Sequence, residues 1–221
     1  MIAEELINQM IPPLKISDTA QKAKTWMEEL HLYQLPVVED LHYKGLVSEE
    51  RLLESDDLSV KLSLIKLESE NIFVKAGTHF YDVVKLALKN KMQVIAVLDD
   101  NSEFLGVISV NDTASAIAQM FASQGPGGII VLALKEIDYS LSQISRLVES
   151  NDSKILSSFV VTDERDPSYI KVTLKLNRSD LTRIIATFER YDYRIVAHFQ
   201  ESELISADKD RLDMLFKYLN I

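Results

Sequence analysis

The sequence contains no cysteine among its 221 residues. This absence excludes disulfides, thiolate metal sites and cysteine nucleophiles, and it is consistent with a reducing compartment. The chain also lacks any apolar run near the ~18 residues that span a bilayer, and its first residues, MIAEELINQM, are acidic rather than basic. We therefore expect no membrane anchor and no signal peptide, and we expect a cytoplasmic protein.

Basic residues are also few. The chain has 24 Lys and Arg against 34 Asp and Glu, a formal net charge of −10, and no cluster of basic residues interrupts this pattern. A surface of this sign repels phosphate backbones, so nucleic acid is not an expected partner. The 47% hydrophobic and 26% charged fractions are typical of folded globular domains and exclude disordered or fibrous classes.

Catalytic motifs are absent as well. The four histidines, His31, His42, His79 and His198, lack metal-ligand spacing, and the chain has no phosphate-binding glycine loop and no Gly-x-Ser-x-Gly motif. We therefore expect no metal site and no enzymatic activity.

What the sequence does contain is an internal repeat. The apolar run Leu35–Asp40 has a counterpart about 60 residues later at Ile95–Asp100, and Gly45–Ser48 has one at Gly106–Ser109. An amphipathic pattern with apolar residues three and four apart precedes each pair of runs, which predicts a helix. Each copy, at about 8–57 and 68–120, thus reads as an extended piece, helix, strand, strand and helix. A copy of this size buries little surface alone, so we expect both to pack together within residues 1–122.

A different pattern follows a glycine-rich stretch. Residues 125–128 hold three of the six glycines and one of the five prolines, which predicts a Gly/Pro hinge at 123–128. Residues 129–221 then predict a domain with the order β, α, β, β, α, β, as in a ferredoxin-like fold, followed by a C-terminal helix. That helix would carry an apolar stripe of Leu212, Leu215, Phe216 and Leu219. The expected fold class is α+β.

The repeated motifs resemble those of a cystathionine-β-synthase (CBS) domain pair, the Bateman module. The hallmarks are Leu35-Pro36-Val37-Val38 and the two Gly-aliphatic-aliphatic-Ser runs that end at Ser48 and Ser109. The second half is similar to an ACT domain in its element order. The combination resembles the acetoin-utilisation (AcuB-like) regulatory proteins. This resemblance implies a non-catalytic regulatory protein whose CBS pair senses an adenosyl compound and whose ACT-like domain dimerises.

The resemblance also implies a binding site in the second copy. The family's adenosyl-binding pattern, Gly-x-x-(Ser/Thr)-x-x-Asp, is complete at Gly106, Ser109 and Asp112, and a carboxylate suits the two hydroxyls of a ribose. Equally, Ser-x-x-Asp at a helix start is close to a capping box, in which both residues serve the helix alone. The remaining residues that the family places around this pocket are Met10, Ile11, Pro12, Tyr33, Leu35 and Val107. Ile11 and Leu35 are alternatively plain core residues.

The first copy departs from this pattern. Ser48 is followed by Arg51 where the family has Asp, so a cation replaces the ribose acceptor. We expect this degenerate site to bind no adenosine. The guanidinium would instead meet a phosphate or, more simply, one of the neighbouring acids Glu49, Glu50 and Glu54.

The ligand and the oligomer remain open at this point. Nucleotide-sensing relatives place a cation before these strands, but the chain has Tyr33-Gln34 and Gln93-Val94 there, which favours S-adenosylmethionine or NAD over AMP or ATP. The turn at 135–140 lacks the glycine of amino-acid-binding ACT domains, so we interpret that domain as a dimerisation element. We expect a small-molecule effector, a homodimer and a regulated partner protein. The alternative is a dimeric interaction scaffold with vestigial ligand sites, which the resemblance relates to acetoin utilisation.

Overall fold

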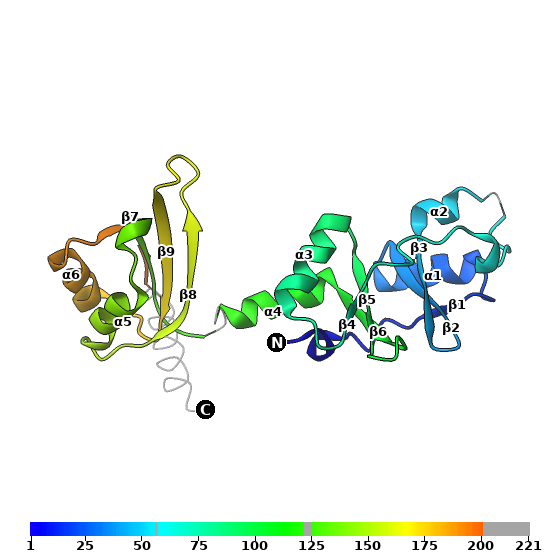
Figure 1. The fold of residues 1–221 in the computed structure, drawn as a ribbon, viewed down its shortest axis with the longest axis horizontal. Coiled ribbons are helices and arrows are strands. Elements are labelled where there is room, and N and C mark those ends of the chain that lie inside the picture. Colours follow the sequence, from blue (N-terminus) through cyan, green and yellow to red (C-terminus); the bar gives the residue numbers. More distant parts are fainter. Residues whose placement is uncertain (56, 122–124, 201–221) are drawn as a thin grey trace, which may run out of the picture. The chain divides into compact units, whose positions relative to one another are not determined.

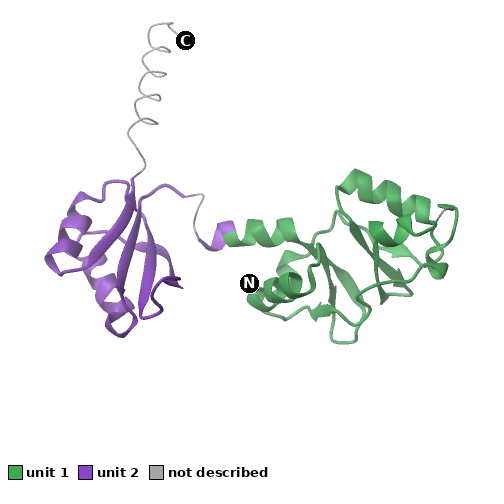
Figure 2. Cartoon of the chain, turned by 90° about the horizontal axis from the view of Figure 1, so that it is seen from above, with its two compact units in different colours: residues 1–117 green, residues 118–221 purple. Residues whose placement is uncertain are grey.

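The computed structural model describes residues 1–55, 57–121 and 125–200. The chain divides into two compact units, residues 1–117 and 118–221 (Figure 2). The predicted C-terminal helix, with Leu212, Leu215, Phe216 and Leu219, lies outside the described residues, as do residues 123 and 124 of the predicted hinge.

The first unit contains two copies of the order β-α-β-β-α, which confirms the predicted repeat (Figure 1). The first copy consists of β1 (Leu14–Lys15), α1 (Ala20–Leu30), β2 (Gln34–Glu39), β3 (His42–Ser48) and α2 (Glu49–Leu53). The second consists of β4 (Phe73–Lys75), α3 (Phe80–Asn90), β5 (Val94–Leu98), β6 (Phe104–Ser109) and α4 (Val110–Met120). Each copy forms a three-stranded sheet, ordered β1-β2-β3 or β4-β5-β6, with a parallel first pair and an antiparallel second pair.

The long helices of the two copies end in the same way. α1 ends at His31 and α3 ends at Lys91, both in the left-handed conformation with φ of 54° and 52°. The next backbone N–H in each case donates to a helix carbonyl 3.0 Å away. The starts differ from each other, because the Thr19 hydroxyl caps α1, whereas the His79 ring caps α3. The His79 ring nitrogen accepts the Tyr81 N–H at 3.3 Å, a contact that a general preference for Gly or Thr does not predict.

The two copies share one hydrophobic core. Buried residues of β2 and β3 form a single cluster with those of β5 and β6, and the apolar faces of α1 and α3 pack onto it. The two copies therefore pack together around a common set of buried side chains, as expected for units of this size.

The second unit is a four-stranded antiparallel sheet with two helices. Its elements are β7 (Ile129–Lys135), α5 (Leu141–Glu149), β8 (Ile155–Thr162), β9 (Tyr169–Leu176), α6 (Thr182–Arg190) and β10 (Arg194–Phe199). The strand order β10-β7-β9-β8 and the sequence β-α-β-β-α-β confirm the predicted ferredoxin-like fold. Strict alternation along β9 directs Ile170, Val172, Leu174 and Leu176 into a core that includes Ile144 and Phe188 of the helices.

Candidate ligand-binding site

Asp112 lies in the first turn of α4, directly after β6 ends at Ser109. Its Oδ2 accepts hydrogen bonds from the Ser109 backbone N–H at 2.8 Å and from the Ser109 hydroxyl at 2.6 Å. The Ser109 Oγ in turn accepts the Asp112 N–H at 3.2 Å. This is the reciprocal capping box that the Ser-x-x-Asp spacing permits, and it fixes a half-buried carboxylate at the start of the helix.

A second group on this carboxylate was not predicted. The Asn8 side-chain amide donates to both Asp112 oxygens, at 3.1 and 3.2 Å. The Asn8 backbone N–H donates to the Val107 carbonyl at 2.8 Å, which holds the segment against β6. Nothing in the local sequence marks Asn8, since its partner lies 104 residues away. All hydrogen-bonding atoms of the described buried side chains have a partner, so the carboxylate is satisfied within the chain.

The other predicted residues of this site divide between surface and core. The Met10 side chain is 79% exposed, and its N–H donates to the Asn8 Oδ1 at 2.9 Å. Ile11 and Leu35 are buried in the core cluster, as the alternative interpretation expected, and Val107 is buried there as well. Pro12, which follows Ile11, is half-buried.

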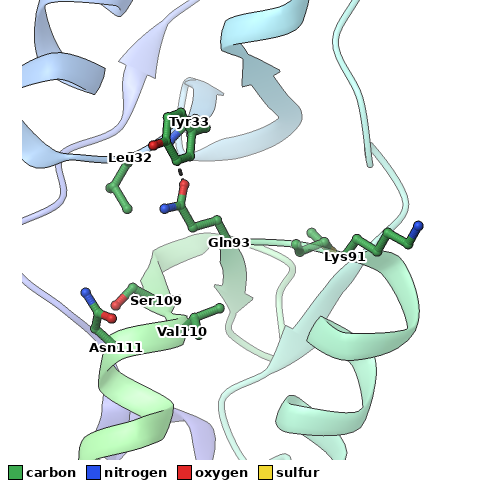
Figure 3. Close-up of a pocket in the computed structure, with 8 residues that line it drawn as sticks. Leu32, Tyr33, Lys91, Gln93, Ser109, Val110 and Asn111 are labelled. Carbon is green, nitrogen blue, oxygen red and sulfur yellow. Dashed lines mark hydrogen bonds between the residues drawn. The ribbon is translucent and has the colours of Figure 1, made fainter.

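A hollow of about 370 Å³ lies between the two copies and brings Tyr33 and Ser109 together. We call it the inter-copy hollow; it is lined by Leu32, Tyr33, Lys91, Met92, Gln93, Ser109, Val110 and Asn111. The Tyr33 N–H donates to the Gln93 Oε1 at 2.6 Å, and Figure 3 shows these two side chains facing each other above the start of α4. The Lys91 side chain extends away from Tyr33 and Ser109 in the same view. Asp112 does not line the hollow, but it is hydrogen-bonded to Ser109, which does.

The degenerate site of the first copy is occupied by an ion pair. The Ser48 hydroxyl caps α2 by accepting the Arg51 N–H at 3.4 Å. The Arg51 side chain donates from Nε to Glu68 at 2.8 Å and from Nη1 to Glu54 at 2.7 Å. The hydrogen bond to Glu68 and the charge of Glu54 raise the pKa of Arg51. The pair with Glu54 agrees with the expectation, whereas the contact with Glu68 was not predicted.

The described residues also bear on two other features, a metal site and a membrane-spanning helix. No three His, Asp or Glu side chains in that part of the chain are grouped so that they could hold a metal ion. None of the helices described here is both long and apolar enough to cross a membrane.

Residues 65–119, which hold nearly all of the second copy, match the family model of the CBS domain. The second copy is therefore a CBS domain, as its motifs predicted, and the first copy repeats its element order. Among curated proteins, inosine-5'-monophosphate dehydrogenase of Bacillus subtilis (strain 168) is 23% identical over 134 residues. The match covers 58% of this chain and 28% of that relative, so this chain corresponds to a minor part of its length.

Several solved structures resemble the chain over about half of its length. A CBS domain pair/ACT domain protein from Thermotoga maritima has a TM-score of 0.49 and 21% identity, over 54% of this chain and 98% of that one. A putative acetoin utilization protein (AcuB) from Vibrio cholerae has a TM-score of 0.49 and 19% identity, over 56% and 95%. CBSX2 in complex with AMP has a TM-score of 0.47 and 21% identity, over 53% and 96%.

Proposed function

We propose that this chain is a regulatory protein without catalytic activity, in which the CBS pair binds an adenosyl compound next to Asp112. The observation that carries the proposal is a half-buried carboxylate that is hydrogen-bonded to Ser109, which lines the inter-copy hollow. A carboxylate accepts hydrogen bonds only, so it suits the two hydroxyl donors of a ribose. The CBS match over residues 65–119 supports the same class of ligand site.

The lining of the hollow indicates which adenosyl compounds fit. The Tyr33 side chain is 65% exposed, so its ring offers a face on which a purine can stack. Lys91 is the only cation in the lining, and its ammonium group is directed away from Tyr33 and Ser109. Bound phosphates would therefore lack a close charge partner. We accordingly place S-adenosylmethionine first and NAD second, with adenine nucleotides as the third class to test.

The test is thermal unfolding of the full chain with S-adenosylmethionine, NAD, AMP and ATP. A compound present at ~100 times its dissociation constant should stabilise the protein by about 2.7 kcal/mol. Asp112→Ala should abolish the shift, because the ribose loses its acceptor. Asp100→Ala removes an equal charge from an exposed turn of the same copy and should leave the shift unchanged.

A second candidate function has its own observation. The Arg51–Glu68 pair fills the first site and Asn8 satisfies Asp112, as expected of an interaction scaffold whose ligand sites are vestigial. If none of the four compounds shifts the unfolding midpoint, the sensing proposal fails and the scaffold is favoured. Binding that persists in Asp112→Ala would overturn the site assignment alone.

The second unit is proposed to hold two chains together. Within the described residues β8 pairs only with β9, and Leu156, Val160 and Val161 on it are 42–51% exposed. An unpaired apolar edge strand invites pairing with another strand. A second copy of this chain fits this edge, because antiparallel pairing about a two-fold axis matches the strand to itself.

A further inference from the structure

The segment that leads into the first strand of each copy lies against the other copy. Asn8 lies before β1, the first strand of the first copy, yet it forms an antiparallel bridge with Val107 in β6 of the second. Glu68 lies before β4, the first strand of the second copy, yet it forms the same kind of bridge with Leu46 in β3 of the first, with hydrogen bonds of 2.7 and 2.8 Å. Asn8 and Glu68 are about one repeat length apart, so they occupy equivalent positions.

Each crossing passes over the glycine of the Gly-x-x-Ser motif. Gly45, with φ of +135°, lies under the Glu68 carbonyl, which a Cβ at this position would approach to 2.8 Å. Gly106, with φ of +156°, lies under Ile7, and a Cβ there would clash with the Ile7 side chain. Both glycines are therefore required by the crossing segments, whether or not a ligand is bound.

The two crossing segments place different side chains, Asn8 and Glu68, at equivalent positions of the two copies. Arg51 and Asp112 each stand three residues after the capping serine of their copy. In the second copy Asn8 donates to the Asp112 carboxylate, whereas in the first copy the Glu68 carboxylate accepts from Arg51. Each motif residue therefore has a hydrogen-bonding partner of the opposite kind within the chain: an amide donor for Asp112 and a carboxylate acceptor for Arg51.

We infer that Asn8 and Glu68 are internal occupants of the two sites, and that they give this chain one adenosyl site of reduced affinity. The inference rests on the proposed function. The Asn8 amide nitrogen lies within hydrogen-bond distance of both oxygens of the carboxylate that would receive the ribose hydroxyls, so the ligand and Asn8 compete for Asp112. Glu68 holds Arg51 through an ion pair that Glu54 shares, and a ribose has no charge with which to replace it.

The experiment is calorimetric titration of the full chain with S-adenosylmethionine, NAD, AMP and ATP. The wild type should bind one molecule per chain. Asn8→Ala should bind the same compound about tenfold more tightly, because the competing hydrogen bond to a charged group is gone. Asn8→Ser is the second variant: its hydroxyl can still accept the Met10 N–H that Asn8 accepts at 2.9 Å, but it is too short to bridge to Asp112. It should change affinity in the same direction.

Glu68→Gln provides the matched control at the equivalent position of the other copy. It should leave the affinity of the Asp112 site unchanged, since Glu68 contacts Arg51 and not Asp112. Wild-type binding that neither Asn8 variant strengthens would overturn the inference and leave the proposed function standing. A stoichiometry of two per wild-type chain would also overturn it. If no compound binds the wild type or either Asn8 variant, the proposed function itself fails.

Discussion

At the scale of the residue, packing against Ile7 requires a glycine at position 106, in the ligand-site motif. An added methyl group at Gly106 would meet the Ile7 side chain at a backbone φ of +156°, which L-residues rarely adopt. We expect Gly106→Ala to lower the free energy of unfolding by about 1–3 kcal/mol, because it combines backbone strain with overpacking. Denaturant unfolding measures this loss.

Gly77→Ala is the control for this substitution in the same copy. No heavy atom lies within 4 Å of a Cβ at Gly77, so its stability should change little. Ile7→Ala combined with Gly106→Ala should recover part of the loss, since the clashing side chain is removed. Equal losses at Gly106 and Gly77 would contradict the packing explanation.

The same residues show where sequence reasoning stops. Ser109 and Asp112 were found because a capping box has a local spacing that a motif can express. Asn8 and Glu68 were not predicted, because their partners lie 104 and 17 residues away in sequence. They meet these partners only when the segment before each copy's first strand packs against the other copy. Arg51 was recognised as a departure from the motif, and Glu54 was found because it lies within one helical turn.

At the scale of the element, Asp18 joins the first strand to the first helix. Its carboxylate accepts the Lys15 N–H at 2.8 Å and pairs with the Lys22 ammonium at 2.9 Å. Although burial opposes ionisation, these contacts outweigh it and lower the pKa of Asp18 below its ordinary value of 3.8. The folded state therefore favours the ionised form more strongly than the unfolded state does.

The sign of the pH dependence follows from that shift. A lowered folded-state pKa contributes stability above the unfolded pKa near 4, and this is lost as the pH falls through the folded pKa. We expect Asp18→Asn to cost about 1 kcal/mol at pH 7. The difference in midpoint from the wild type should shrink as thermal unfolding is repeated toward pH 3. A difference that stays constant with pH would show that the charge of Asp18 contributes nothing.

Elements were predictable where their signals were periodic. The repeat, the amphipathic faces of α1 and α3 and the alternation along β9 were all legible, because burial imposes those periods directly. The N-cap of α3 was not predictable in this way. His79 accepts the Tyr81 N–H with a ring nitrogen, and residue types that cap helices more commonly lie next to it in the sequence. The roles of Ile11 and Leu35 were left open between ligand site and core, because an apolar residue beside a ligand site and one in the core look alike in sequence.

At the scale of the whole molecule, the proposed dimer depends on the edge strand β8. Val161 is 51% exposed on this strand, whereas Phe159 already contacts Phe121 with ring centroids 5.0 Å apart. Val161→Lys places a charge on the proposed interface without removing a core contact, so the fold of each chain should lose less than about 0.5 kcal/mol. We expect light scattering to give twice the 25.1 kDa chain mass for the wild type and the single mass for Val161→Lys.

Ile137→Lys is the matched control, because Ile137 is 89% exposed and lies on the turn before α5, away from the edge strand in the sheet order. It should remain dimeric. A dimer that survives Val161→Lys would place self-association elsewhere in the chain, and a monomeric wild type would remove the dimerisation role.

Because a charge on β8 leaves Asp112 and Asn8 untouched, ligand affinity measured on the monomeric variant also tests coupling. An affinity equal to that of the dimer means that the ligand is sensed within one chain, whereas a changed affinity means that binding and assembly are linked, each altering the other by the same factor.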